Sequence, residues 1–189
     1  MKSEASSFLV RNRRRATALL GRFGASARGA TAVEFSIVAL PFLMLLFAVL
    51  ELGLIFMIST SLEDSTGDVA RRIRTGEMQT TGVTAASFKQ QLCDEIILLN
   101  DCATRLKVDV RTFDQFDDMD EIEDPINEEG EFDDSATTFQ PGGAEDIVLV
   151  RAYYKWTLIT PLMNESLQSL SDGSRLITAS VAFRNEPYQ

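Results

Sequence analysis

The side chains that most often carry chemistry are scarce in this sequence. It contains no histidine, which removes the commonest general base and the commonest zinc ligand. The two cysteines, Cys93 and Cys102, lie nine residues apart. If this part of the chain is exported, a disulfide is the favoured interpretation, because the alternative, a metal site, lacks further ligands. No nucleophile elbow, phosphate-binding loop or dinucleotide-binding turn occurs, so we expect neither an enzyme nor a cofactor.

Carboxylates are concentrated in one stretch, residues 114–134, where twelve of 21 residues are acidic and none is basic. A solvated loop, extending to residue 146, is the simplest interpretation. Calcium binding is the alternative, but Asp117, Asp118 and Asp120 do not follow the ligand spacing of a calcium loop. A docking surface for a basic partner subunit is a third interpretation. Apolar residues interrupt the acids, so parts of the loop should pack back onto the protein: Phe113, Phe116, Ile122, Ile126, Phe132 and Phe139.

A different kind of chemistry is indicated where the basic leader meets the first apolar run. Residues 29–35 read GATAVEF and resemble a type IV prepilin processing site. The resemblance implies cleavage between Gly29 and Ala30 by an inner-membrane aspartyl protease. Glu34 would then lie about one helical turn from the new α-amine of Ala30, and in a filament it could neutralise a neighbour's amine. The other interpretation of Glu34 is a first-turn acid favoured by the helix dipole.

The wider sequence around this site resembles the start of TadE-like proteins, the minor-pilin-like components of tight-adherence (Flp-type) pilus machines. The matching residues are Arg28, Gly29, Ala32, Val33, Glu34, Phe35, Pro41, Glu51 and Gly53. Residues 177–188 (ITASVAFRNEPY) also resemble the closing strand of that family. The resemblance implies processing by a prepilin peptidase and a role in pilus assembly with other pilin-like subunits. Phe35 departs from the major-pilin pattern, which usually has tyrosine after the glutamate.

These residues must be positioned by a membrane helix. Residues 35–58 are apolar except for Glu51, and as a helix they would extend about 36 Å, enough to cross a bilayer. Residues 1–29 hold seven basic side chains and one acid, so the positive-inside rule predicts a cytoplasmic leader and an exported remainder. The expected location is the bacterial inner membrane, with one span. A buried core helix is the alternative, but a helix that is apolar all round has no solvent face.

The exported part is expected to be a small α+β domain. Alternating and β-branched patterns predict three antiparallel strands, at 105–113, 147–158 and 174–184. In the first strand we expect one face inward and the other outward: Leu106, Val108 and Val110 in, Lys107, Asp109 and Arg111 out. Helical spacing predicts that the first helix continues to Gly76 and that a second helix covers the sheet at 84–99, capped by Thr84. A short helix is expected at 161–170, opening at Pro161.

The expected organisation is therefore a leader at 1–29, which is cleaved, a transmembrane and extended helix at 30–76, and an exported domain at 77–189. Residues 30–189 carry 11 basic and 27 acidic side chains, a net charge of −16, which argues against nucleic-acid binding. Three functions fit: a pseudopilin-like subunit, a permanently anchored scaffold of the secretion machine that stays out of the fibre, or an unrelated signal-anchored domain. The first is favoured by the motif at Gly29–Phe35.

Overall fold

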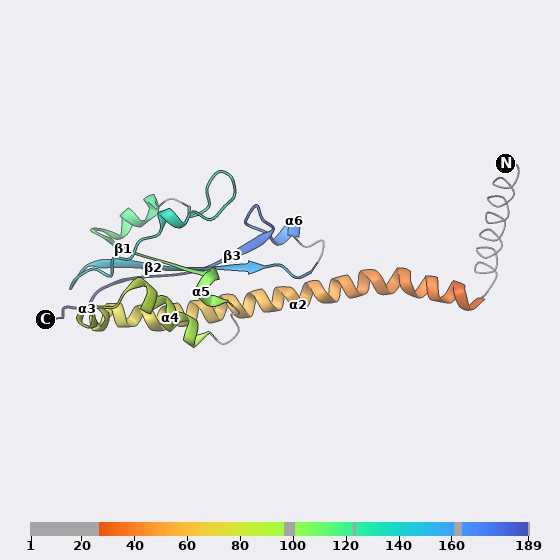
Figure 1. Ribbon diagram of the computed structural model, residues 1–189, viewed down its shortest axis with the longest axis horizontal. Helices are drawn as coiled ribbons and strands as arrows, with labels where there is room; N and C mark the ends of the chain where they lie inside the picture. Colours follow the sequence, from red (N-terminus) through yellow and green to blue (C-terminus); the bar gives the residue numbers. More distant parts are fainter. Residues whose placement is uncertain (1–26, 97–100, 123, 161–163, 189) are drawn as a thin grey trace, which may run out of the picture. The chain divides into compact units, whose positions relative to one another are not determined.

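The computed structural model describes residues 27–96, 101–122, 124–160 and 164–188. Figure 1 shows the order of the elements along the chain. The helices are α2 (Ala27–Arg74), α3 (Glu77–Thr81), α4 (Ala85–Glu95), α5 (Cys102–Arg105) and α6 (Asn164–Leu167), with 3-10 turns η1 (Phe116–Glu121) and η2 (Asp134–Ala136). The strands are β1 (Leu106–Phe113), β2 (Ile147–Thr157) and β3 (Ser174–Arg184). The predicted class, α+β with a long N-terminal helix and a three-stranded antiparallel sheet, is confirmed.

The long helix α2 belongs to two compact units, Met1–Phe47 and Ala48–Gln189, which are described separately. In the first unit its described residues are almost entirely apolar, and large side chains are exposed on every side of the helix. Pro41 lies within the helix, a position that membrane-spanning helices tolerate. By length and composition α2 is able to cross a membrane. It ends at Arg74, close to the predicted end, because Gly76 adopts a left-handed backbone conformation (φ 79°).

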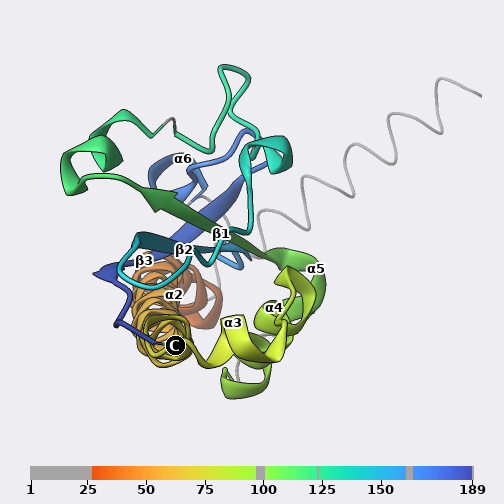
Figure 2. The same cartoon turned by 90° about the vertical axis from the view of Figure 1, so that its left-hand side faces the viewer.

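The second unit is built on the sheet, in which β2 lies between β1 and β3 and both pairings are antiparallel. One face of the sheet, here called the helix face, packs against residues 48–74 of α2 and against α4 (Figure 2). Its register brings side chains of all three strands into one layer, for example Val110, Val150 and Val181. The α2 side chains that meet this layer form a single stripe that is fully buried, namely Leu62, Val69 and Ile73. This stripe is the spacing expected of an amphipathic helix on a sheet.

Helix α4 follows the predicted pattern closely. The Thr84 hydroxyl accepts the Ser87 amide, and Ser87 in turn accepts the Thr84 amide, which completes a capping box. Phe88, Leu92 and Ile96, spaced four residues apart, are buried, and the ring centroids of Phe88 and Phe139 are 5.6 Å apart. The helix ends at Glu95, four residues before the predicted end, and Leu99 lies outside the described residues.

Two predictions about the domain need correction. Asp109 was expected to face solvent, but it is 1% exposed, because the acidic segment covers the second face of the sheet. This second face is called the loop face below. The predicted helix at 161–170 is present only as the single turn α6, at Asn164–Leu167, and Pro161 lies outside the described residues.

Candidate functional site

The predicted processing and assembly residues all lie in the first turns of α2. The bond between Gly29 and Ala30 is inside the helix, two residues after its first described residue, Ala27. Glu34 and Phe35 follow about one turn further along the same helix.

Glu34 stands on an otherwise apolar helix surface. Its neighbours Val33, Phe35 and Val38 are 60%, 72% and 69% exposed. Ala30 and Glu34 are four residues apart and so project from the same side of the helix. Within the described chain the Glu34 carboxylate has no hydrogen bond or ion pair. In an apolar environment such an acid is costly unless a cation of another molecule, or a freed amine, lies beside it.

The second acid of α2, Glu51, has a different role, which the sequence did not show. It is 3% exposed, and its two carboxylate oxygens accept the amides of Ile159 and Thr160 at 2.6 and 2.8 Å. These amides lie directly after β2 ends at Thr157. Glu51 therefore fastens the end of the central strand to the helix, and we call this contact the Glu51 clamp. Nothing local in the sequence predicts it, because the partners are 108 and 109 residues away.

The two cysteines form the predicted disulfide. Cys93 lies in the last turns of α4 and Cys102 begins α5, and their Cα atoms are 5.7 Å apart. The bond links α4 to the turn that leads directly into β1. In the chain-entropy model a loop this short stabilises the fold by about 2–3 kcal/mol. Its formation requires an oxidising compartment, as an exported domain would have.

The acidic segment is structured where it meets the sheet, at Asp109. This carboxylate accepts Arg111 at 3.0 Å, Arg151 at 2.6 Å and the amide of Thr138 at 2.8 Å. Residues 138–140 continue along the edge of β1, where Val110 donates to Thr138 and accepts from Gln140, both at 2.8 Å. Asp109 thus joins two strands to the returning segment, and its charge is balanced by two guanidinium groups.

Aromatic residues complete the cover of the loop face. Phe132 packs on Tyr153 with ring centroids 5.3 Å apart, and the Arg151 guanidinium lies over the Tyr153 ring. Burial raises the pKa of Tyr153 to about 12. The prediction that apolar residues pack the acidic segment onto the sheet is thus confirmed for Phe132 and Phe139, but Phe116 is 51% exposed.

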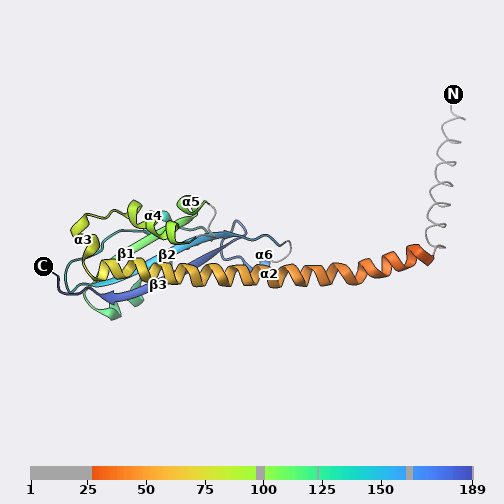
Figure 3. The ribbon, with the colours of Figure 1, turned by 90° about the horizontal axis from the view of Figure 1, so that it is seen from below.

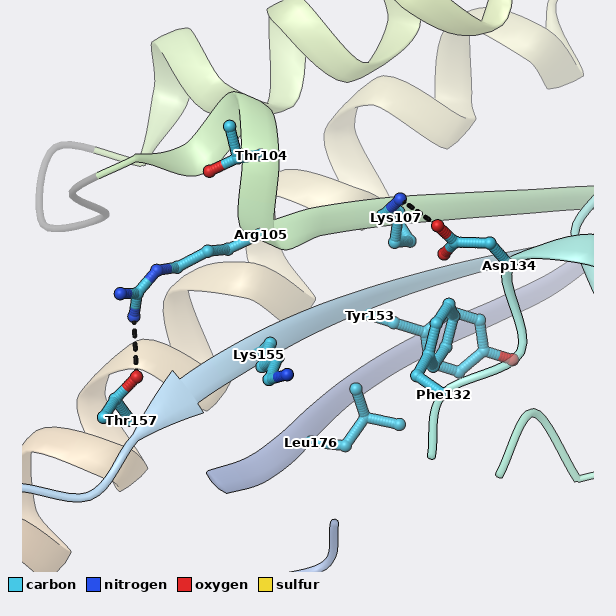
Figure 4. Close-up of a pocket in the computed structure, with 9 residues that line it drawn as sticks. All are labelled: Thr104, Arg105, Lys107, Phe132, Asp134, Tyr153, Lys155, Thr157 and Leu176. Carbon is cyan, nitrogen blue, oxygen red and sulfur yellow. Dashed lines mark hydrogen bonds and ion pairs between the residues drawn. The ribbon is translucent and has the colours of Figure 1, made fainter. Parts of the chain in front are cut away.

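A cavity of about 440 Å³ opens on the loop face near the end of β2 (Figure 4). Three cations line it, and each has a partner: Lys107 pairs with Asp134, Arg105 donates to Thr157, and Lys155 pairs with Asp172. The Lys155 ammonium and the Ser174 hydroxyl hold the pKa of Asp172 at about 2, below its usual value.

The acids that could have bound calcium lie close together in sequence but form no metal site in the described structure. Asp117, Asp118 and Asp120 lie in η1, and the Asp118 carboxylate is used to accept the amide of Gln115. Among the described residues, no group of three or more Asp, Glu, Cys or His side chains is close enough to hold a metal ion.

The C-terminal motif closes the domain. Asn185 is buried, and its side-chain amide donates to the carbonyls of Pro141 and Gly143 at 3.1 and 2.7 Å. Glu186 reaches the end of α2, where its amide donates to the Arg74 carbonyl at 2.8 Å and its carboxylate pairs with the Arg74 guanidinium. Asn185 therefore attaches the C-terminal segment to residues 141–143, and Glu186 attaches it to the end of α2.

Comparison with known proteins gives a family match for α2. Residues 29–71 match the family model described as TadE-like protein, which confirms the family predicted from the motif. The matched range contains Glu34, Glu51 and most of the buried stripe. No curated protein and no solved structure was found to match the chain. The match covers 43 of the 189 residues, all of them in α2.

Proposed function

Taking the TadE-like helix as the premise, we propose that this chain is a pseudopilin-like subunit required to assemble a tight-adherence pilus. A prepilin peptidase removes residues 1–29, and the mature helix then packs against helices of other pilin-like subunits. The observation that carries the proposal is the first half of α2. Its apolar surface is exposed on all sides, and it carries one acid, Glu34, which has no partner within the described chain.

Membrane insertion is supported by energetics. Exposed side chains such as Phe35, Leu40 and Phe42 would be in water in a soluble protein, and each buries favourably in lipid. The basic leader keeps the N-terminus cytoplasmic under the positive-inside rule. The domain that follows is then periplasmic, which agrees with its disulfide.

Assembly is supported by the position of Glu34. After cleavage the chain would begin with the α-amine of Ala30, one turn from Glu34. A subunit that enters a bundle of apolar helices buries both charges, and pairing them between neighbours offsets the cost of desolvation. The geometry thus provides a reason for a single acid at this place.

The alternative is a permanently anchored scaffold of the secretion machine, which would keep its leader and stay out of the fibre. Both functions use the same membrane helix. They differ in whether the leader is removed and in whether Glu34 is needed for pilus assembly.

The test measures the mature N-terminus and the pili together. Mass spectrometry of the native protein should show Ala30 as the first residue, whereas a chain that begins at Met1 would favour the scaffold. A Glu34→Ala variant should lose pili, and the matched variant Glu63→Ala, at an exposed acid of the same helix, should keep them. Normal piliation with Glu34→Ala would instead favour an unrelated signal-anchored protein.

A further inference from the structure

The two edge strands of the sheet, β1 and β3, differ in whether their outward backbone amides and carbonyls have hydrogen-bond partners. On the β1 edge, residues 138–140 bond to Val110 and the amide of Thr138 bonds to Asp109, so that edge is covered. The other edge is β3. An uncovered edge strand presents a row of amides and carbonyls that can pair with another chain.

The direction of the β3 backbone groups follows from its first residues. The Leu176 amide donates away from the sheet, to the Ser169 hydroxyl, and the Ser174 carbonyl accepts the amides of Ser169 and Leu170. Because alternate residues of a strand point the same way, the backbone groups of Thr178, Ser180 and Ala182 also face outward. In the part of the chain that the structure describes, these groups have no hydrogen-bond partner.

The middle of this edge, residues 178–182, also lacks the features that usually prevent strand pairing. Thr178, Ser180 and Ala182 have small exposed side chains, without the lysine or proline that commonly protects an edge. A groove of about 440 Å³ adjoins the strand on the loop face, lined by Thr178 and Ser180 on one side and Pro125 and Ile126 on the other. An added strand would place alternate side chains in this groove, as in recognition by β-strand addition.

The direction of β3 argues against a second copy of this chain as the occupant. β3 begins beside Thr157, near the Glu51 clamp, and the chain after it bonds to Arg74, so β3 and α2 run the same way (Figure 3). Antiparallel pairing of two β3 strands would point their α2 helices in opposite directions. In copies anchored in one membrane the α2 helices point the same way, so two β3 strands could pair only in parallel. A parallel pair is slightly less stable per residue than an antiparallel pair.

We infer that the outer edge of β3 is an interaction surface for an extended segment of a different exported protein, which adds to the sheet as a fourth, antiparallel strand. Charge narrows its chemistry. Residues 174–184 include Arg175 and Arg184 and no acid, and the exposed Arg184 makes no ion pair within the described residues. The segment therefore carries a carboxylate opposite Arg184 and an apolar side chain for the groove. This inference rests on the export assumed in the proposed function.

The test is photo-cross-linking in the native cells with the full chain. p-Benzoylphenylalanine at Ser180 should form an adduct whose cross-linked peptide maps to an exported segment of another protein, and the same probe at the exposed Ala103 should not. Ala182→Pro removes an outward amide and leaves the β2 ladder intact, so the Ser180 adduct should fall at least tenfold. Ala182→Ser keeps the amide and should keep the adduct.

No adduct at Ser180, an adduct to a second copy of this chain, or an adduct undiminished by Ala182→Pro would overturn the inference. Formation of the Cys93–Cys102 disulfide reports folding of each variant. If the Ala182→Pro variant does not form the disulfide, the Thr178→Pro variant, which removes another outward amide, is used instead. The position to which the Ser180 cross-link maps then decides whether another exported protein occupies the edge. The mature N-terminus is read in the same samples. An unprocessed chain would contradict the proposed function. A processed chain without the adduct would contradict the inference that the β3 edge binds another protein.

Discussion

The two halves of α2 have similar side chains in different surroundings. In the first half, large apolar side chains such as Phe35 and Ile37 are about 70% exposed around the whole helix, at 72% and 68%. In the second half, Leu62, Val69 and Ile73 are 0% exposed, and exposed charged residues such as Glu63, Asp64 and Asp68 lie between them. One continuous helix can therefore suit two environments. The first half can bury its apolar side chains only against lipid or other helices, whereas the second half packs its apolar stripe on the sheet of the same chain.

The largest expected effect is on the free energy of unfolding, which should fall for a core substitution in the second half of α2 but not for one in the first half. Leu62→Ala leaves a cavity between α2 and the sheet and should lower the free energy of unfolding by about 2–5 kcal/mol. Leu45→Ala, at an exposed position of the first half, should change it by less than about 0.5 kcal/mol. Denaturant unfolding of the full chain in detergent, followed by the fluorescence of Trp156, measures both. Equal losses would mean that the first half is also a packed core.

A second comparison concerns membrane insertion. Leu45→Lys places a charge near the middle of the apolar run and should oppose insertion by about 2.5–3.5 kcal/mol. Asp68→Lys, at an exposed position of the second half, should have no such effect. The measurement is the fraction of protein that resists alkaline extraction from membranes, and comparable extraction of the two variants would contradict a span in the first half.

The junction of the halves is tested at Glu51. Glu51→Ala leaves the amides of Ile159 and Thr160 without an acceptor and should cost about 1–3 kcal/mol. Glu51→Gln keeps one acceptor oxygen and should cost less. Hydrogen exchange at the two amides should accelerate most in Glu51→Ala, while exchange in α4 stays slow. Unchanged protection of both amides would show that the clamp does not hold the strand end.

The smallest effect is a pH dependence confined to the domain. Residues 35–50 contain no ionisable group, whereas Asp172 has a pKa of about 2, below its usual 3.8. A depressed carboxyl pKa stabilises the fold above the unfolded value, and this contribution is lost as the pH falls through about 2. Because the Lys155–Asp172 pair is about half exposed, we expect less than about 1 kcal/mol. Asp172→Asn should flatten stability between about pH 4 and pH 2, and an unchanged slope would assign it to other carboxyls.

Local pattern was enough to predict most of the elements. The three strands, the Thr84 cap, the stop at Gly76 and the disulfide follow from spacing and side-chain type, which act over a few residues. The apolar run of α2 needed no partner to be recognised, because a helix that is apolar all round fits only an apolar solvent.

The sequence by itself determined this plan: a helix apolar enough to span a membrane, with an acid near its start, joined to an α+β domain. Only the tertiary structure decided which polar groups meet. It buried Asp109 under the acidic segment, placed Glu51 against Ile159 and Thr160, and fixed the C-terminal motif to Arg74. These contacts join residues 29 to 112 positions apart, and no local periodicity encodes such distances. They exist because each buried charge or amide needs a partner, and the fold brings one within reach.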